Sequence, residues 1–557
     1  MKKPEMRGRQ REGSSTHKRM PSREYLNALD KEENSDTFHE NYNNINPAGY
    51  AINAEASLFG NKSGGSSPFR NMIKLFFVFL VVQGPNGLAK DVGTPSWRHS
   101  FPHVLVATIS SFLFGYHLGV VNETLESISY DLDFSGNTLA EGLVVSTCLG
   151  GAFVGSSFSG WIADGLGRRR SFQLLALPMI IGASISATTT SLGGMLVGRA
   201  FVGTGMGLGP PVAALYVSEV SPSSVRGAYG SFIQISTCLG LMAALFIGIP
   251  AKGILGWWRI CFWVSAIPAA SLALLMEFCA ESPHWLVKKG RGAEAEIQFE
   301  KLLGGSHAKS AMAELFKSDR GDDADSIKIT ELLYGRHFRV VLMGSILFAL
   351  QQLSGINAVF YFSSAVFRSA GVPSDIGNIC IGIANLSGSI AAMVLMDKLG
   401  RKVLLMWSFM GMAVAMGIRV IAASSVVSGS GEMYLSVGGM LLFVLTFSLG
   451  AGPVPGLLLS EIFPNRIRAE AMAVCQAVHW LTLMLFSVSD KLVHLCQVIN
   501  FFVGLLFLRL LEQLGPVILY TIFSSFCLIA VAFVKRNVLE TKGKTLQEIE
   551  IALLAND

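Results

Sequence analysis

The sequence predicts an all-α integral membrane protein whose twelve transmembrane helices form two six-helix bundles joined by short intracellular helices. Three observations predict this class. Hydrophobic residues make up 51% of the 557 residues and charged residues only 15%, against about 25% in an ordinary soluble domain. Long apolar runs recur from residue 103 onward. Motifs of the first half of the chain also reappear, in the same order, in the second half.

Residues 1–100 differ from the rest and are expected to form a polar, flexible tail rich in Asn, Ser and Glu. No apolar run stands next to Met1, as a secretory signal peptide requires. Glu5, Glu12 and Glu24 are also unusual for an organelle transit peptide, which is poor in acids. The tail therefore gives no clear targeting signal.

Twelve apolar runs are candidates for membrane spans, which need about 20 residues each. The polar segment 281–337 separates an N-terminal bundle, 101–280, from a C-terminal bundle, 338–535, and residues 536–557 form a second tail. Within that segment, residues 293–303 and 308–318 show the periodicity of short amphipathic helices. The expected spans are 103–121, 140–162, 171–190, 194–218, 229–250, 258–280, 338–366, 376–396, 402–424, 434–460, 469–489 and 515–535.

Lys and Arg gather in the connections that follow the even-numbered spans, at residues 168–170, 226, 281–336, 398–402 and 466–468. The loop expected at 122–139 has no Lys or Arg and carries four acids instead. Basic loops favour the cytoplasmic side of a membrane. Both tails and the central segment are therefore predicted on that side, or on its equivalent in an organelle.

Three motifs indicate an internal duplication, which is typical of secondary transporters. DGLGRR at 164–169 reappears as DKLGRK at 397–402, and Ser218-Glu219 as Ser460-Glu461. Glu281 closes the first half and Glu540 the second. The offset between the halves rises from 460 − 218 = 242 to 540 − 281 = 259 residues. The 17 extra residues are best placed at 481–497, as an apparent insertion. It either bulges out and leaves twelve spans, or makes 492–511 an additional, thirteenth span.

The seventh span holds Gln351, Gln352 and Asn357 in the motif QQLSGIN, with Gly355 placed to loosen the helix. Side-chain amides both donate and accept hydrogen bonds without carrying charge, which suits a neutral, polyhydroxylated ligand. Polar groups are costly inside a membrane and tend to be functional there. The simpler alternative is that these amides only bond neighbouring helices.

The chain resembles the sugar porter family of the major facilitator superfamily over residues 100–557, and its second half is similar to the plant plastidic glucose transporters. The motifs that carry the resemblance are DGLGRRR, GRAFVG, SEVSPSSVRG, ESPHWL, QQLSGIN, DKLGRK, GAGPVP, SEIFPNRIR and ETKG. The resemblance implies a hexose transporter, foremost for glucose, that works by alternating access and is not an enzyme. It also implies the plastid envelope, with other endomembranes or the plasma membrane as alternatives.

The resemblance further implies two sets of functional residues. The sugar would be bound by Gln234, Gln351, Gln352, Asn357 and Asn385. Charges at the ends of the spans can pair across the two halves, and in this family they close the inner face. The expected gate comprises Arg168, Arg169, Glu219, Arg226, Asp397, Arg401, Glu461 and Arg468.

Two departures from the family pattern bear on mechanism. Proton-coupled members carry an Asp where this chain has His117, which favours facilitated diffusion and leaves a coupling role for His117 as the alternative. Gly456 replaces a Trp that is common in animal facilitators. A proton-coupled symporter remains an alternative, and the insertion at 481–497 keeps open a non-transporting sensor or an inactive isoform.

No cofactor or metal is expected, because the eight Cys are scattered and form no Cys/His cluster. The Gly-rich run at 203–209 lies within a span and predicts close helix packing, not nucleotide binding. The expected partners are a small sugar and the lipid membrane, without nucleic acid. The oligomeric state stays open.

Overall fold

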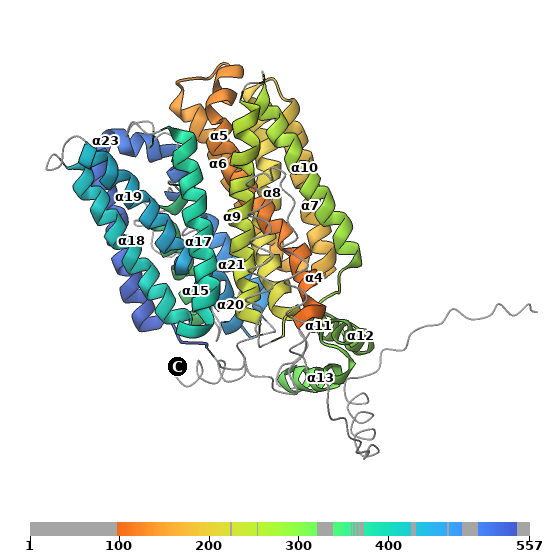
Figure 1. Ribbon diagram of the computed structural model, residues 1–557. Coiled ribbons are helices and arrows are strands. Elements are labelled where there is room, and N and C mark those ends of the chain that lie inside the picture. Colours follow the sequence, from red (N-terminus) through yellow and green to blue (C-terminus); the bar gives the residue numbers. More distant parts are fainter. Residues whose placement is uncertain are drawn as a thin grey trace, which may run out of the picture. The chain divides into compact units, whose positions relative to one another are not determined.

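The computed structural model describes residues 97–222, 225–252, 254, 256–319, 338–357, 359, 363, 367, 373–424, 430–464, 467–481 and 499–542. Residues 1–96 of the predicted N-terminal tail, residues 482–497 of the insertion and residues 543–557 lie outside this part. Every regular element of the described residues is helical, which confirms the predicted all-α class. The helices are shown in Figure 1.

The first half of the chain, here α4 to α10, begins each long helix soon after the previous one ends. The helix bounds are α4 Trp97–Ala107, α5 Ile109–Asp131, α6 Thr138–Leu166, α7 Arg168–Thr188, α8 Leu192–Val220, α9 Arg226–Ala251 and α10 Trp257–Leu275, followed by the short η1, Met276–Phe278.

The connecting segment carries three short helices, α11 Pro283–Lys288, α12 Gly292–Leu303 and α13 Gly305–Asp319. The last two confirm the predicted amphipathic helices. Helix α12 buries Ala295, Phe299 and Leu302, which lie three to four residues apart on one face.

The second half, here α15 to α23, is described with more interruptions. Its helix bounds are α15 Phe338–Leu353, α17 Ser374–Leu399, α18 Arg401–Ala423, α19 Ser430–Thr446, η2 Phe447–Ala451, α20 Val454–Ile462, α21 Arg468–Leu481 and α23 Ile499–Asn537. Helices α17 and α21 of this half pack against α9 and α6 of the first half, respectively.

Ten helices of the described residues are long and apolar enough to cross a membrane, and α15 is a shorter apolar helix. One predicted boundary is wrong. The first span runs from Arg98 to Asp131, so the first ten residues of the loop expected at 122–139 are helical. The helix continues because its polar residues there are bonded to other helices: the Glu123 side chain is only 3% exposed.

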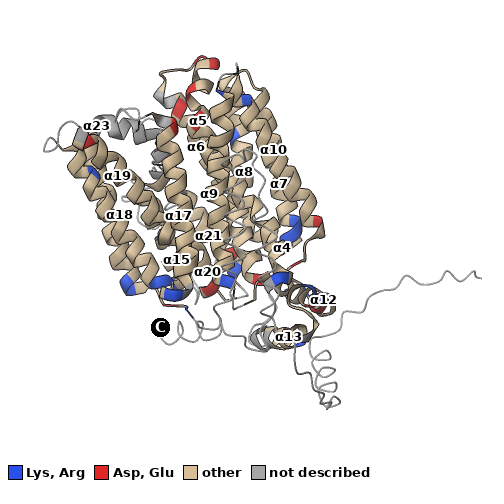
Figure 2. Ribbon diagram, viewed as in Figure 1, with Lys and Arg blue, Asp and Glu red and all other residues tan. Residues whose placement is uncertain are grey.

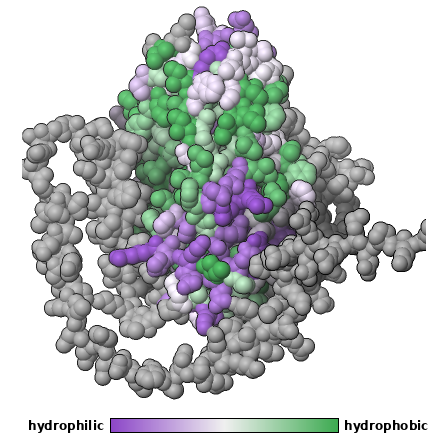
Figure 3. All heavy atoms as spheres, turned by 90° about the vertical axis from the view of Figure 1, so that its right-hand side faces the viewer, coloured by the Kyte–Doolittle hydropathy of each residue, from purple (hydrophilic) through white to green (hydrophobic). Residues whose placement is uncertain are grey.

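The surface of α7 and α10 shows why these helices need lipid. Figure 3 shows a broad belt of hydrophobic side chains on the face of the molecule that carries them. Large apolar side chains recur there at helical spacing and point away from the protein, at Leu174, Leu177, Ile181, Ile260, Trp263, Ile267 and Leu274. Such a belt is costly in water and favourable against acyl chains.

The charges lie mainly at the two ends of the helices (Figure 2). Lys and Arg gather at the end where α11, α12 and α13 lie, here called the inner end, whereas acids are prominent near the end of α5 at the opposite, outer end. This distribution agrees with the orientation that the basic loops predict.

Glycines let α6 and α8 approach until their backbones touch. A Cβ added at Gly151 would lie 2.3 Å from the carbonyl oxygen of Ala200, and one at Gly203 would lie 2.1 Å from that of Cys148. At Gly207 the corresponding distance, to Ala152 O, is 1.9 Å. The packing role predicted for the run 203–209 is confirmed, since only glycine fits at such contacts.

Two spans are broken at the places that the sequence predicts. Helix α15 ends at Leu353, and Gly355 follows with a φ of +91°. In the tenth span the α-helix gives way to the π-helix η2, and the N–H of Gly452 donates to Phe447 O at 2.9 Å. Both breaks lie at membrane depth, where a loosened backbone is found when it faces protein or a cavity.

The glycine packing can be tested with two neighbouring residues of α6. Gly151→Ala is expected to lower the melting temperature of the detergent-purified protein by several degrees, because its new methyl group meets the backbone of α8. Gly150→Ala is the control, since a Cβ there meets nothing within 4 Å. It should leave the melting temperature unchanged or raise it slightly, as alanine favours a helix. Equal effects of both would contradict the packing account.

Candidate functional site

A cavity lies between the two halves of the chain. It is lined by residues of α5, α8 and α9 from the first half and of α15, α17, η2, α20 and α21 from the second. None of the described lining residues is Asp, Glu, Lys or Arg. The polar residues of this described lining are amides, hydroxyls and one histidine, which offer hydrogen bonds without a fixed charge.

All five residues predicted to bind the ligand line this cavity. Three of them follow from the broken seventh span. Gln351, at the end of α15, donates through Nε2 to Ala451 O of the π-helix. Its Oε1 is buried and accepts no hydrogen bond within the described residues. A buried acceptor in this state is costly to the free protein and available to a ligand hydroxyl.

Gln352 is bonded at both ends of its amide. Its Oε1 accepts from Asn357 Nδ2 at 3.0 Å, and its Nε2 lies 2.5 Å from His479 Nε2. The turn at Gly355 brings Asn357 back over the end of α15, five residues after Gln352. Each end of the amide has one partner and retains one further donor or acceptor site for a ligand.

Gln234 and Asn385 complete the predicted set from the two sides of the cavity. The Gln234 amide is adjacent to Gly452, where an added Cβ would lie 3.4 Å from its Nε2. Asn385 is buried, and its Oδ1 accepts from the hydroxyl of Ser448 in the π-helix. The break in the tenth span thus contacts amides of both halves.

Sequence reasoning missed Gln476 and His479, which lie three residues apart on one face of α21 and both line the cavity. Gln234 is implied by the family resemblance; the signal that singled out the seventh span, an amide inside a membrane span, applies equally to Gln476. Gly456 also lines the cavity, and a Cβ there would meet nothing within 4 Å. The cavity therefore has room for a larger side chain at position 456.

His117 does not line the cavity. It is fully buried in α5, its ring meets Tyr116 edge-on, and neither ring nitrogen has a hydrogen-bond partner within the described residues. Among the charged side chains, Arg199 of α8 acts on it electrostatically. Its coupling role stays a prediction that this placement does not support.

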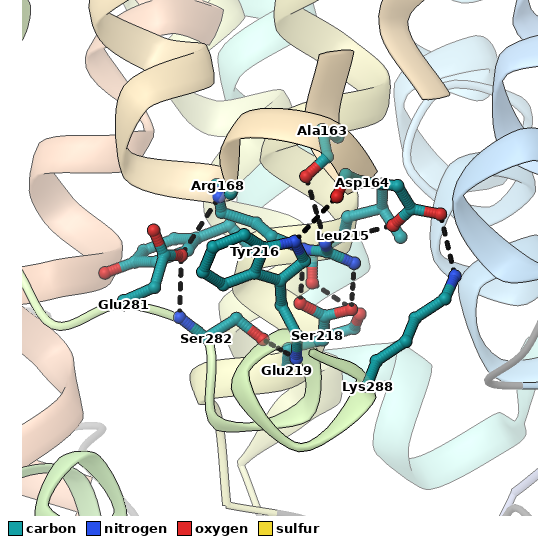
Figure 4. Close-up of polar contacts among 12 residues, drawn as sticks. Ala163, Asp164, Arg168, Leu215, Tyr216, Ser218, Glu219, Glu281, Ser282 and Lys288 are labelled. Atoms are coloured by element: carbon teal, nitrogen blue, oxygen red, sulfur yellow. Dashed lines mark hydrogen bonds and ion pairs between the residues drawn. The ribbon is translucent and has the colours of Figure 1, made fainter. Parts of the chain in front are cut away.

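A second polar site lies at the inner end of the first half (Figure 4). Arg168, the first residue of α7, donates from Nε and Nη2 to the two carboxylate oxygens of Glu219, each at 2.8 Å. Its Nη1 donates to Ala163 O and Asp164 Oδ1, both at 3.2 Å. The Arg168 and Glu219 side chains are 4% and 1% exposed, so the pair is removed from water and bidentate.

Glu281 caps the same helix from a distant part of the chain. Its carboxylate accepts from the backbone N–H groups of Arg168 at 3.0 Å and Arg169 at 3.3 Å, which otherwise have no partner at a helix N-terminus. Burial raises the pKa of Glu281, while these donors oppose the shift. Gly167 makes room with a φ of +92°, since a Cβ there would lie 2.7 Å from Glu281 Oε2.

The second half repeats this arrangement. Arg401 Nη2 donates to Glu461 Oε1 at 3.0 Å, and Glu540 accepts from the N–H groups of Arg401 and Lys402 at 2.9 and 3.0 Å. Gly400 has a φ of +89°, as Gly167 does. Thr541 adds a bond of its own, donating to Glu461 Oε2 at 2.8 Å. The repeated motifs thus build repeated sites.

The other predicted gate residues are placed differently. Arg169 contacts Glu277 at 3.0 Å near the surface, and Arg468 is buried and donates to Phe463 O at 3.1 Å. Arg226 begins α9 and is half-buried. The side chain of Asp397 lies outside the described part. The pairs Arg168–Glu219 and Arg401–Glu461 each lie within one half, because both partners come from spans of the same bundle.

His284 of α11 lies close enough to act with the charges of both halves. Burial lowers the pKa of its imidazole to about 4; Glu219 acts against this shift, and Arg468, Arg226 and Arg168 add to it. The inner ends of the two halves therefore share one electrostatic environment.

Comparison with known proteins adds to this geometry. A family model described as "Sugar (and other) transporter" matches residues 103–553. "Probable plastidic glucose transporter 3" of Arabidopsis thaliana is 68% identical over 475 residues, 85% of this chain and 92% of that protein. "Probable plastidic glucose transporter 2" of the same plant is 70% identical over 467 residues, 84% of this chain and 91% of that protein.

A solved structure shares the fold. It is that of the major facilitator superfamily proton:xylose symporter XylE bound to 6-bromo-6-deoxy-D-glucose, with a TM-score of 0.71 and 28% sequence identity. The match covers 82% of this chain and 99% of that one. The two-bundle major facilitator fold that the motifs predict is confirmed.

The buried pair can be tested with two adjacent arginines. Arg168→Lys is expected to destabilise the protein by about 1–3 kcal/mol, because lysine cannot reproduce the bidentate contact with Glu219 and leaves buried acceptors unsatisfied. Arg169→Lys is the control, because its pair with Glu277 is partly exposed, at 28% for Arg169 and 64% for Glu277, and such pairs contribute about 0–1 kcal/mol. Arg169 also donates to Met276 O and Glu277 O, so a smaller loss, not none, is expected. Melting temperatures of the two purified variants decide the matter. Comparable losses for both would contradict a special role of the buried pair.

Proposed function

The chain belongs to the sugar (and other) transporter family, and from that premise we propose that it carries a hexose, foremost glucose, across the plastid envelope by alternating access. The relatives that are 68% and 70% identical bear the name plastidic glucose transporter. That likeness spans most of both chains and supports the substrate class and the compartment together.

One observation supports the substrate class most directly. Every polar residue of the described lining is an amide, a hydroxyl or a histidine, and this part of the lining has no acid, lysine or arginine. A sugar hydroxyl donates and accepts at the same atom, so it matches amides better than it matches fixed charges. Apolar residues such as Phe348, Phe447 and Leu457 supply the remaining wall, against which a sugar ring can rest.

Gln352 is the residue to which we assign the largest share of binding. Its amide is bonded to Asn357 and contacts His479. A hexose that takes the place of either bond releases a second polar group to bind another hydroxyl. Gln351, Gln234 and Asn385 surround the same space, so several hydroxyls can be bonded at once.

The inner charged sites are proposed to hold the inner ends of each half in fixed geometry while the halves move relative to each other. Arg168–Glu219 and Arg401–Glu461 connect spans within a bundle. When the bundles move relative to each other, the interactions that change would be those that cross the halves, including the electrostatic interactions of His284 with residues of both halves.

Facilitated diffusion is the proposed mode of transport. Support comes from the missing carboxylate: His117 stands in place of the Asp of proton-coupled members and lies apart from the cavity, and the described lining has no Asp or Glu. Uptake of labelled glucose into proteoliposomes should therefore be insensitive to a protonophore. His479, which lines the cavity and contacts Gln352, is the titratable group that the symporter alternative would use. Protonophore-sensitive accumulation against a glucose gradient would favour the symporter alternative.

The binding residues can be tested by labelled-glucose counterflow in proteoliposomes. Gln352→Ala is expected to reduce exchange at least about tenfold, because it removes a buried group that bonds the sugar. Gln173→Ala is the matched control: Gln173 bonds Glu277 and Ala273 O near the surface of α7 and does not line the cavity. Equal exchange by both variants would remove Gln352 from the binding site.

The same assay addresses the insertion. A chain that lacks residues 481–497 should be measured beside the full chain. Exchange by both would show that the insertion is tolerated. Exchange by the shortened chain alone would identify the full chain as an inactive isoform, and exchange by neither, in folded protein, would contradict the proposed function.

A further inference from the structure

A network of polar side chains joins the two halves at the outer end, opposite the inner charged sites. Its central residue is Lys252, which follows the last residue of α9. The Lys252 ammonium lies 3.2 Å from Glu123 Oε2 of α5 and also contacts Asp375 Oδ1, in the first turn of α17. Lys252 and Glu123 belong to the first half and Asp375 to the second.

The buried acid of this network is bonded across the halves a second time. Glu123 Oε1 accepts from Asn378 Nδ2 of α17 at 2.6 Å. Asn378 Oδ1 accepts from the hydroxyl of Ser363 at 2.8 Å, and the same hydroxyl accepts from Asn122 Nδ2 at 3.0 Å. Three contacts thus cross between the halves: Lys252–Asp375, Glu123–Asn378 and Asn122–Ser363.

The position of the cavity relative to this network is informative. The lining of the cavity reaches Ser218 and Ser460, which directly precede the inner acids Glu219 and Glu461. It includes none of the six residues of the outer network. In this conformation the described lining thus extends to the inner acids and does not extend to the outer network.

We propose that Lys252, held between Glu123 and Asp375, is an outer latch that keeps the two halves together while the outer end is closed. The inference rests on the proposed alternating access, since a latch matters only if the halves separate. Opening must break the Lys252–Asp375 and Glu123–Asn378 contacts together, and it exposes a carboxylate that is now only 3% exposed.

The charge balance explains why lysine suits this place. Burial lowers the pKa of Lys252, but the hydrogen bond from its ammonium to Asp375 and the charge of Glu123 outweigh burial and raise it above its usual value. Lys252 thus stays charged at any physiological pH. Because the Lys252 side chain is one-third exposed, salt on the outer side can screen its attraction to the two acids.

The latch is tested by how fast a cavity residue reacts with a membrane-impermeant thiol reagent added from the outer side. Gly456→Cys serves as the reporter, because it lines the cavity and its Cβ meets no atom within 4 Å. The chain without this substitution gives the background of the native cysteines. Lys252→Met and Asp375→Asn are each expected to speed outer labelling about three- to tenfold and to slow labelling from the inner side.

Three controls give the test its specificity. Lys252→Arg should label at close to the parental rate, since it retains the charge. Asp133→Asn should have no effect, because Asp133 is exposed, near the same end of α5, and makes no ion pair among the described residues. The double variant of Lys252→Met and Asp375→Asn should label no faster than the faster single variant, because each substitution already removes the Lys252–Asp375 contact.

Salt provides an independent measurement. About 1 M salt reduces the Debye length to about 3 Å, so it should speed outer labelling of the parental chain and leave Lys252→Met unchanged. Parental rates for both Lys252→Met and Asp375→Asn, or additive effects in the double variant, would overturn the latch. Faster labelling of the two variants in a protein that exchanges no glucose would uphold the latch and contradict the proposed function. Glucose exchange with unchanged labelling of the variants would support the proposed function and contradict the latch.

Discussion

Each half of the molecule depends on a buried guanidinium group that must be neutralised. Arg168 and Arg401 begin helices at the inner end, where burial of an unpaired charge would be prohibitive. Glu219 and Glu461 supply the counter-charges from a second helix, and Glu281 and Glu540 cap the same helix ends from a third segment. One electrostatic requirement therefore fixes the relative position of three segments in each half.

The polar groups of the cavity differ from those of the inner sites because the described ones carry no fixed charge. The cavity's amides are satisfied mainly by uncharged partners, and these are drawn from helices whose regular hydrogen bonding is interrupted, at Gly355 and in the π-helix that ends at Ala451. A free carbonyl or a turned backbone at membrane depth is accommodated because it faces this space. The two kinds of site thus differ in role: ion pairs connect helices within each bundle, and uncharged hydrogen-bonding groups line the cavity.

Much of this could be predicted from the sequence because membrane spans and duplicated motifs are local signals. The helices, the two breaks, the close packing of the glycine run and the amides of the seventh span follow from residue type and spacing, whereas Gln234 and Asn385 are implied by the family resemblance. The end of the first span could not be predicted, since Asn122 and Glu123 look like loop residues until their partners on α17 and at Ser363 are known. The pairing of gate charges within each half, and the position of His479, likewise depend on three-dimensional contacts that spacing alone does not encode.

The uncharged lining of the cavity has an energetic consequence for the cell. Moving one elementary charge across a membrane is worth about 2.3 kcal/mol per 100 mV. A neutral sugar carried through a cavity whose described lining has no Asp, Glu, Lys or Arg moves no such charge. The voltage across the membrane then exerts no force on the cargo. With the facilitated diffusion proposed above, flux would be set by the sugar concentrations alone and would reverse when their gradient does.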